Sequence, residues 1–182
     1  MRKFALPVAL VFLAWFAGVS AQDDEKQGRL NLGADKATRG DQAFIPVVWS
    51  PPAGMAVRKI AAEMRFPRKS LVFEEARNSG TSDSSTLEVH AEVVAGEESA
   101  PNSVLRLCVE SKANEAISSG AVAMLTFKVL DEAPVGQAVT LETRAEGFGV
   151  TEPTAAIPLL SNKGEIDIVQ VPVVFACYFY MH

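Results

Sequence analysis

The chain has 182 residues, of which 48% are hydrophobic and 21% are charged, and its formal net charge is −5. This length is sufficient for one globular domain with a hydrophobic core, and the composition excludes a disordered chain, a collagen-like repeat and a disulfide-dense miniprotein. An acidic chain offers no basic surface for nucleic acid or anionic lipid, so neither is predicted as a partner.

The first 21 residues have the layout of a secretory signal peptide. Arg2 and Lys3 precede an apolar stretch over residues 4–19, and small residues end at Ala21, where polar sequence begins. The alternative is a membrane anchor, but an apolar stretch of about 16 residues is shorter than the roughly 20 that a spanning helix needs. We therefore expect cleavage after Ala21, a disordered lead-in over residues 22–28, and a secreted, periplasmic or cell-surface protein with no membrane span.

Alternation of apolar and polar residues predicts four half-buried strands in the middle of the chain. They cover residues 57–66, 86–94, 104–110 and 120–129. Shorter candidate strands, separated by turns rich in Gly, Pro, Ser and Asn, lie at residues 30–32, 44–49, 71–76, 139–143 and 166–171. About nine short strands without βαβ spacing predict an all-β fold, an antiparallel β-sandwich of jelly-roll type over residues 29–170.

Two segments have some helical character. Residues 56–64 are rich in Ala, Arg, Lys, Glu and Met, which favour a helix. Their strict alternation nevertheless predicts a strand, because burial of one face overrides intrinsic propensity. Residues 113–119 are expected to add one helical turn.

The two cysteines, Cys108 and Cys177, leave two alternatives open. In an exported protein an even number of cysteines permits one disulfide bond, but two cysteines carry no spacing information, so two unpaired thiols remain the alternative. A zinc site is not predicted, because only His90 and His182 could join these cysteines as ligands. We expect no metal and no other cofactor.

No pattern in the sequence predicts catalysis. His90 lies on the polar face of a predicted strand between Glu88 and Glu92, which is typical of a solvated surface. A catalytic histidine needs a cleft, a nucleophile and an orienting acid, and the adjacent acidic pairs of this chain fall at strand ends or turns. The sequence therefore predicts a protein that is not an enzyme.

Five short segments of the chain are similar, in the same order, to those of one known family. They are a turn and strand at residues 37–47, a corner at 66–73, a Gly-led alternating strand at 117–129, an Ala-Pro-Val-Gly turn at 133–136 and a Gly-x-Ile-x-Ile strand at 164–168. Together they resemble the cohesin domain, the scaffoldin module of cellulosomes that captures dockerin modules. The resemblance covers most of the chain after the signal peptide.

This resemblance implies a jelly-roll-like sandwich, secretion and non-catalytic binding in an extracellular polysaccharide-degrading system. The implied partner is a dockerin-like or other secreted protein. The same structural superfamily includes cellulose-binding modules, so direct binding of polysaccharide is the alternative function. On the strand before the corner the family tends to present Asn or Asp outward, where this chain has Lys59, Ala61, Glu63 and Arg65.

The charged sides of three predicted strands supply a candidate protein-binding face. Its residues are Lys59, Glu63, Arg65, Glu88, His90, Glu92 and Arg106. Charges at the rim of an interface set specificity and association rate when a partner binds. For the carbohydrate alternative the contact candidate is Trp49, because sugar rings stack on exposed aromatic faces and Trp49 is the only Trp that remains after cleavage.

The last segment, residues 171–182, raises a third function. It is apolar and β-prone, contains a proline and is too short for a membrane span. An unpaired strand of this kind can associate with the sheet edge of another chain, which would give the protein a structural or assembly role.

Overall fold

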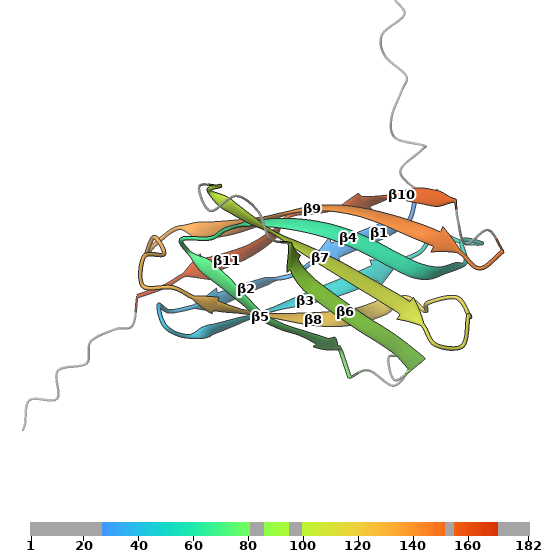
Figure 1. The fold of residues 1–182 in the computed structure, drawn as a ribbon, viewed down its shortest axis with the longest axis horizontal. Helices are drawn as coiled ribbons and strands as arrows, with labels where there is room; N and C mark the ends of the chain where they lie inside the picture. Colours follow the sequence, from blue (N-terminus) through green and yellow to red (C-terminus); the bar gives the residue numbers. More distant parts are fainter. Residues whose placement is uncertain (1–26, 81–85, 95–99, 152–154, 171–182) are drawn as a thin grey trace, which may run out of the picture.

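The computed structural model describes residues 27–80, 86–94, 100–151 and 155–170. These residues form eleven strands and no α-helix (Figure 1). The strands are β1 (Arg29–Leu32), β2 (Ala34–Ala37), β3 (Gln42–Ser50), β4 (Val57–Pro67), β5 (Leu71–Asn78), β6 (Leu87–Val94), β7 (Asn102–Ser111), β8 (Gly120–Val129), β9 (Ala138–Gly149), β10 (Ala156–Ser161) and β11 (Gly164–Ile168). Within the described ranges no helix is long and apolar enough to cross a bilayer. The predicted signal peptide and the segment from residue 171 onward lie outside the described residues.

The strands form a sandwich of two layers around one core. Hydrogen bonding connects them in the order β5-β8-β3-β1-β10-β9-β4-β7-β6. Strands β5, β8, β3 and β1 form one layer, and β10, β9, β4, β7 and β6 form the other, so that β9 and β4 lie above β3 and β8 in Figure 1. The β1–β10 pair joins the layers, while β11 pairs with both β9 and β2. The predicted all-β sandwich is confirmed.

The sequence predicts a purely antiparallel sandwich, but the structure contains two parallel strand pairs among its described residues. β1 pairs in parallel with β10, and β2 pairs in parallel with β11. Parallel neighbours need a long connection, and each of these pairs joins the beginning of the domain to its end, with eight strands between its two members in the sequence. Only the folded chain brings these segments together, which is why alternation alone did not predict the pairing.

The separation of β1 from β2 has a local cause at Pro46. The Gly33 N–H donates to the Pro46 carbonyl at 2.9 Å, so the missing N–H of Pro46 lies on the side of β3 that faces β1 and β2. A β carbon on Gly33 would lie 2.6 Å from Pro46 Cγ. Glycine therefore accommodates the proline ring where the ladder is interrupted, and β2 begins on the other side of the break.

The four strands predicted from alternation are β4, β6, β7 and β8. The segment that also favoured a helix is β4, which is paired on both sides, by β7 and by β9. Because both edges of β4 are hydrogen-bonded and one face is buried, the local helical preference of its residues does not decide the structure.

Two strands were not predicted, and β9 is more than twice as long as predicted. β2 is short and carries little apolar surface, while Pro158 in β10 argues against a strand interior. β9 was expected to end at residue 143 but continues to Gly149. A β carbon on Gly147 would lie only 3.2 Å from Val57 Cγ2. Glycine, which in the sequence suggests a turn, therefore lies inside β9 because the neighbouring strand packs closely against it.

The helical turn expected over residues 113–119 is wrong. A tight turn places Asn114 at φ 57°, and no residue over 113–119 is helical. Ile117 is buried, its N–H donates to the Val57 carbonyl at 2.7 Å, and its carbonyl accepts a hydrogen bond from Trp49 Nε1 at 3.2 Å. These tertiary bonds use the backbone groups of Ile117 that a helix would have used.

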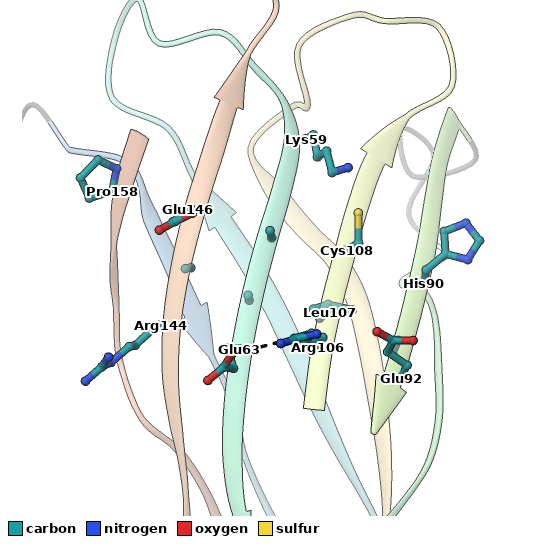
Figure 2. A pocket seen from close by; sticks show the side chains of 14 residues that line it. Lys59, Glu63, His90, Glu92, Arg106, Leu107, Cys108, Arg144, Glu146 and Pro158 are labelled. Atoms are coloured by element: carbon teal, nitrogen blue, oxygen red, sulfur yellow. Dashed lines mark ion pairs between the residues drawn. The ribbon is translucent and has the colours of Figure 1, made fainter. Parts of the chain in front are cut away.

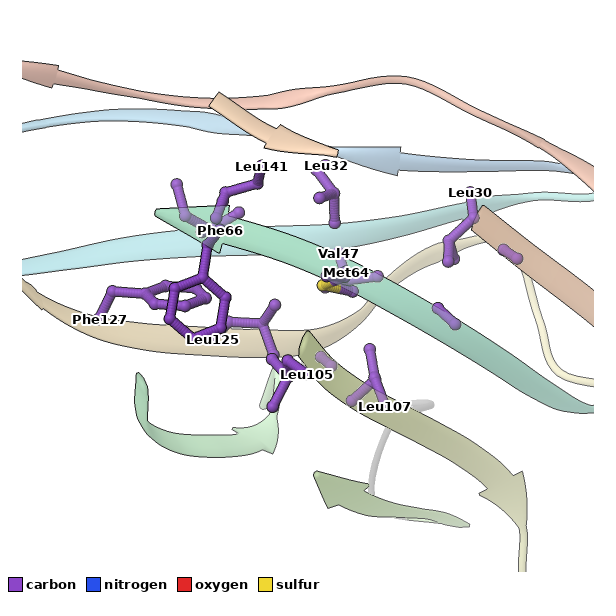
Figure 3. Packing of buried hydrophobic residues seen from close by; sticks show 14 of the residues in the cluster. Leu30, Leu32, Val47, Met64, Phe66, Leu105, Leu107, Leu125, Phe127 and Leu141 are labelled. Carbon is purple, nitrogen blue, oxygen red and sulfur yellow. The ribbon is translucent and has the colours of Figure 1, made fainter. Parts of the chain in front are cut away.

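The core consists of the inward side chains of both layers (Figure 3). Phe127 of β8 packs edge-on against Phe66 of β4, with ring centroids 5.3 Å apart, and against Phe73 of β5 at 5.7 Å. The aromatic contacts therefore link the two layers at the end where β5 begins, and the rest of the interior is filled mainly by aliphatic side chains, together with Met64 and Trp49.

Candidate functional site

All seven residues of the predicted face lie on one side of the layer formed by β9, β4, β7 and β6. We call this side the outer face; it consists of the outward side chains of these four strands. In an antiparallel sheet, residues directly opposite each other point to the same side. The register pairs Lys59 with Glu110, Glu63 with Arg106, and Glu92 with Arg106. The structure therefore places these seven side chains together on one surface.

Charged side chains of alternating sign cross the outer face in one row. Arg144 of β9 is paired with Glu63 of β4, Glu63 with Arg106 of β7, and Arg106 with Glu92 of β6. We call these four residues the charged row, and Figure 2 shows them across the lower part of the face. Only the central pair forms an ion pair, with Arg106 Nε 4.0 Å from Glu63 Oε2.

A second row, which we call the low row, contains two short side chains. It runs from Glu146 through Ala61 and Cys108 to His90. Because alanine and cysteine are much shorter than the charged residues on either side of them, the surface is hollowed here. The hollow has a volume of about 750 Å³ and extends from Pro158 on β10 to His90 and Glu92 on β6 (Figure 2).

The ion pairs of the outer face are exposed and long. Glu63 lies 4.0 Å from both Arg65 and Arg106, Lys59 lies 3.6 Å from Glu110, and only His90 and Glu88 approach to 3.0 Å. The side chains of His90 and Arg106 are 70% and 60% exposed. Exposed pairs of this kind contribute about 0–1 kcal/mol to the free energy of unfolding. They therefore stabilise the fold little, and their charges are accessible to a partner.

The contribution of β9 to this face was not predicted from the sequence. Arg144 and Glu146 line the hollow, and Glu142 is ion-paired with Lys163 at 3.6 Å. The alternation of charged residues at 142, 144 and 146 was the available signal. The predicted strand ended at residue 143, so Arg144 and Glu146 were not assigned to it. No local feature of the sequence indicates that β9 lies beside β4.

The carbohydrate-contact candidate is corrected by the structure. Trp49 is 0% exposed, and its ring nitrogen is used in the hydrogen bond to Ile117. Trp49 ends β3 with its side chain in the core, so its ring presents no face on which a sugar could stack. The physical reason is the alternation of β3, which places Ala43, Ile45, Val47 and Trp49 on the inward side.

Cys108 lies in the low row as a half-buried, free thiol. Cys177, its predicted disulfide partner, lies outside the described residues, so the pairing stays a prediction. Burial raises the pKa of the Cys108 thiol, and the nearby Lys59 ammonium partly opposes this effect. Within the described residues no group of three His, Cys, Asp or Glu side chains is arranged to bind a metal ion.

Alkylation of Cys108 is expected to be slow in the folded protein. A raised thiol pKa leaves less thiolate at any given pH, and thiolate is the reactive form, so the reaction with iodoacetamide should reach its half-maximal rate at a higher pH than in the protein unfolded in urea. Replacing Lys59 with methionine removes the opposing charge and should shift this pH upward again. Mass spectrometry of the peptide that contains Cys108 measures the rate separately from Cys177. Equal pH profiles in the folded and unfolded protein would contradict the burial of this thiol.

No family model matches the sequence, and no curated protein matches it. The fold is nevertheless similar to many solved structures of cohesins. The third cohesin ScaC of Acetivibrio cellulolyticus, solved in complex with the ScaB dockerin, is 16% identical, with a TM-score of 0.60 over 79% of this chain and 99% of that one. The seventh ScaB type I cohesin of Pseudobacteroides cellulosolvens is 14% identical, with a TM-score of 0.60 over 84% of this chain and 99% of that one.

A cohesin described as non-cellulosomal shares the fold to a similar degree. This domain of the archaeon Archaeoglobus fulgidus is 16% identical, with a TM-score of 0.57 over 79% of this chain and 92% of that one. The predicted resemblance is thereby confirmed at the level of the fold.

Proposed function

We propose that this chain, which has a cohesin-type fold, is a secreted, non-catalytic module that binds a protein partner through its outer face. The observation that carries the proposal is the outer face itself. It combines a hollow of about 750 Å³ with exposed charges of both signs, several of which have no ion-pair partner among the residues that the structure describes. Protein interfaces typically combine an apolar centre with a polar rim, and the outer face has this arrangement.

The partner that we propose is a dockerin-like protein. Several structural neighbours were solved as complexes of a cohesin with a dockerin, among them the CaCohA2 complex and the Coh-OlpC complex of Clostridium thermocellum. The signal-peptide-like N-terminus supports a location outside the cytoplasm, at the cell surface or beyond it. The corresponding context is an extracellular polysaccharide-degrading system.

The test uses immobilised protein comprising residues 22–182 and offers it two sets of ligands. One set contains purified dockerin modules, including those of the cohesin–dockerin complexes named above, together with the secreted proteins of the source organism. The other set contains soluble and insoluble polysaccharides. Saturable binding of a purified dockerin or of an identified secreted protein, with no retention of glycans, is the expected result.

Two matched variants connect the binding to the outer face. Ala61→Arg fills the hollow with a long charged side chain, and Ala34→Arg makes the same change at an exposed position of β2, away from the outer face. Binding should be lost in the first variant and kept in the second. Retention of glycans alone, or no saturable binding of any protein, would overturn the proposal.

A further inference from the structure

We propose that residues 171–182, the C-terminal tail, dock on the outward side of β3 and β8 in the same chain. We call this side the back face, because it belongs to the opposite layer from the outer face (Figure 1). Three observations support this docking: an apolar strip on the back face, the composition of the tail, and the place where the described chain ends. The proposed function does not depend on it, because the two faces lie on different layers.

The back face carries an apolar strip that the described residues leave partly exposed. The outward side chains along β3 include Phe44, Pro46 and Val48, and Met124 lies directly opposite Pro46 on β8. Phe44 is 41% exposed, and the other three residues of the strip are half-buried. The solvated side of an antiparallel layer is usually polar, and an exposed apolar patch commonly marks a place where another segment binds. Covering the strip would therefore be favourable.

The tail has the composition that this strip favours. On β5, Glu75 and Arg77 border the strip and are ion-paired with each other at 3.9 Å, so the border favours an uncharged occupant. No residue from 171 to 181 is charged. Alternate side chains of an extended segment share one side, and one side of the tail consists of Val171, Val173, Phe175, Cys177, Phe179 and Met181. The other side contains both tyrosines and His182, whose polar groups would face water.

The described chain ends near the beginning of β3. The Val169 N–H donates to the Ala37 carbonyl at 3.0 Å, so the end of β11 lies beside the end of β2. A short turn then leads from β2 into Gln42, the first residue of β3 (Figure 1). Residue 171 therefore starts about two strand spacings, roughly 10 Å, from the beginning of β3. An extended tail spans about 40 Å, which is enough to pass β2 and to follow β3 as far as Val48.

A tail docked on the back face keeps the two cysteines apart. Cys108 lies in the low row of the outer face, on the other layer, whereas Cys177 belongs to the apolar side of the tail. Docking therefore favours two unpaired thiols over the disulfide bond that the sequence also permits. It also makes Cys177 a reporter of the contact, because a thiol that is covered by the apolar strip reacts slowly with an alkylating reagent.

The test measures alkylation of Cys177 in the protein comprising residues 22–182, with a synthetic peptide of residues 168–182 as the reference. Both are reduced before iodoacetamide is added, and mass spectrometry follows the fragment that contains Cys177. We expect the reaction in the protein to be at least about tenfold slower than in the peptide, which corresponds to a docked tail in about nine of ten molecules. Equal rates, or a disulfide bond between Cys108 and Cys177 in the protein as purified, would overturn the proposal.

Two pairs of variants connect the protection of Cys177 to the apolar strip. Phe44→Lys places a charge in the strip and should remove most of the protection, whereas Val150→Lys, at a similarly exposed apolar position beyond the end of β9, should keep it. Phe175→Lys and Tyr180→Lys test the same contact from the tail without changing the sandwich. The first lies on the apolar side and should lose protection, and the second should keep it, each compared with the peptide that carries the same substitution.

The dependence on protein concentration identifies which chain supplies the tail. Protection within one chain should be the same at all protein concentrations, with a monomer in sedimentation experiments. Protection that appears only together with a dimer would assign the strip to the tail of a second copy and would overturn docking in the same chain. Protection that survives both Phe44→Lys and Phe175→Lys would show that the tail is covered elsewhere, and would overturn it as well. Each of these outcomes leaves binding at the outer face to its own test.

Discussion

Replacing Trp49 with alanine is expected to lower the free energy of unfolding by about 3–5 kcal/mol, the usual loss for removal of a large buried aromatic side chain. Trp49 is completely buried, and a β carbon on Gly28 would lie 2.3 Å from its Cη2 atom. The ring therefore fills the space between the start of β1 and the end of β3. The substitution also removes the hydrogen bond from Trp49 Nε1 to the Ile117 carbonyl. Loss of this donor to a buried carbonyl lowers the free energy of unfolding further.

Urea unfolding followed by far-UV circular dichroism measures this effect, since the variant without the signal peptide contains no Trp for fluorescence. Trp49→Phe is the control, because it keeps most of the apolar volume and should lose less stability than Trp49→Ala. A Trp49→Ala variant with the stability of the wild-type protein would show that the side chain is not part of the core. This position would then become a candidate for ligand contact again.

Replacing Phe127 with alanine is expected to cause a loss of similar size, about 3–5 kcal/mol. Phe127 is 0% exposed and makes edge-to-face contacts with Phe66 and Phe73, at interplanar angles of 70° and 68°. Each such contact is worth about 0.5–1.5 kcal/mol beyond the buried area. Because Phe66 belongs to the opposite layer, the substitution leaves a cavity between the two layers (Figure 3).

The matched control for this prediction is Phe44→Ala. Phe44 lies on β3, the strand next to β8, but points outward and is 41% exposed. Its removal should cost clearly less than the removal of Phe127 when the midpoints of thermal or urea unfolding are compared. Similar losses for the two variants would contradict the assignment of inward and outward sides in this layer.

The location of the seven charged residues on one face could be predicted from the sequence. Lys59, Glu63 and Arg65 alternate with apolar residues along one segment, and a strand with one buried side must place them together on the other. The same reasoning holds for β6 and β7, so the seven predicted residues share one surface. Binding of a protein by this surface is implied by the resemblance and not by the alternation, and it stays a proposal.

Other parts of the site did not follow from the sequence. The hollow depends on Ala61 and Cys108 lying side by side although they are far apart in the chain, and on β9 and β10 extending the surface beyond β4. Trp49 is a similar case, because its position at the end of a strand is compatible with either a buried or an exposed ring. Its burial is decided by Gly28 and Ile117, which only the folded chain brings to it.

The class of the fold, the positions of β4, β6, β7 and β8 and the charged side of these strands could be predicted from the sequence alone. These features follow from period-two alternation and from turn residues, which are local properties of the chain. The tertiary structure alone decided which strands are neighbours, where β1 and β2 meet β10 and β11, and which charges on the outer face are paired. The physical reason is that any strand edge can hydrogen-bond to any other, so the choice among partners depends on how all the inward side chains fill one core.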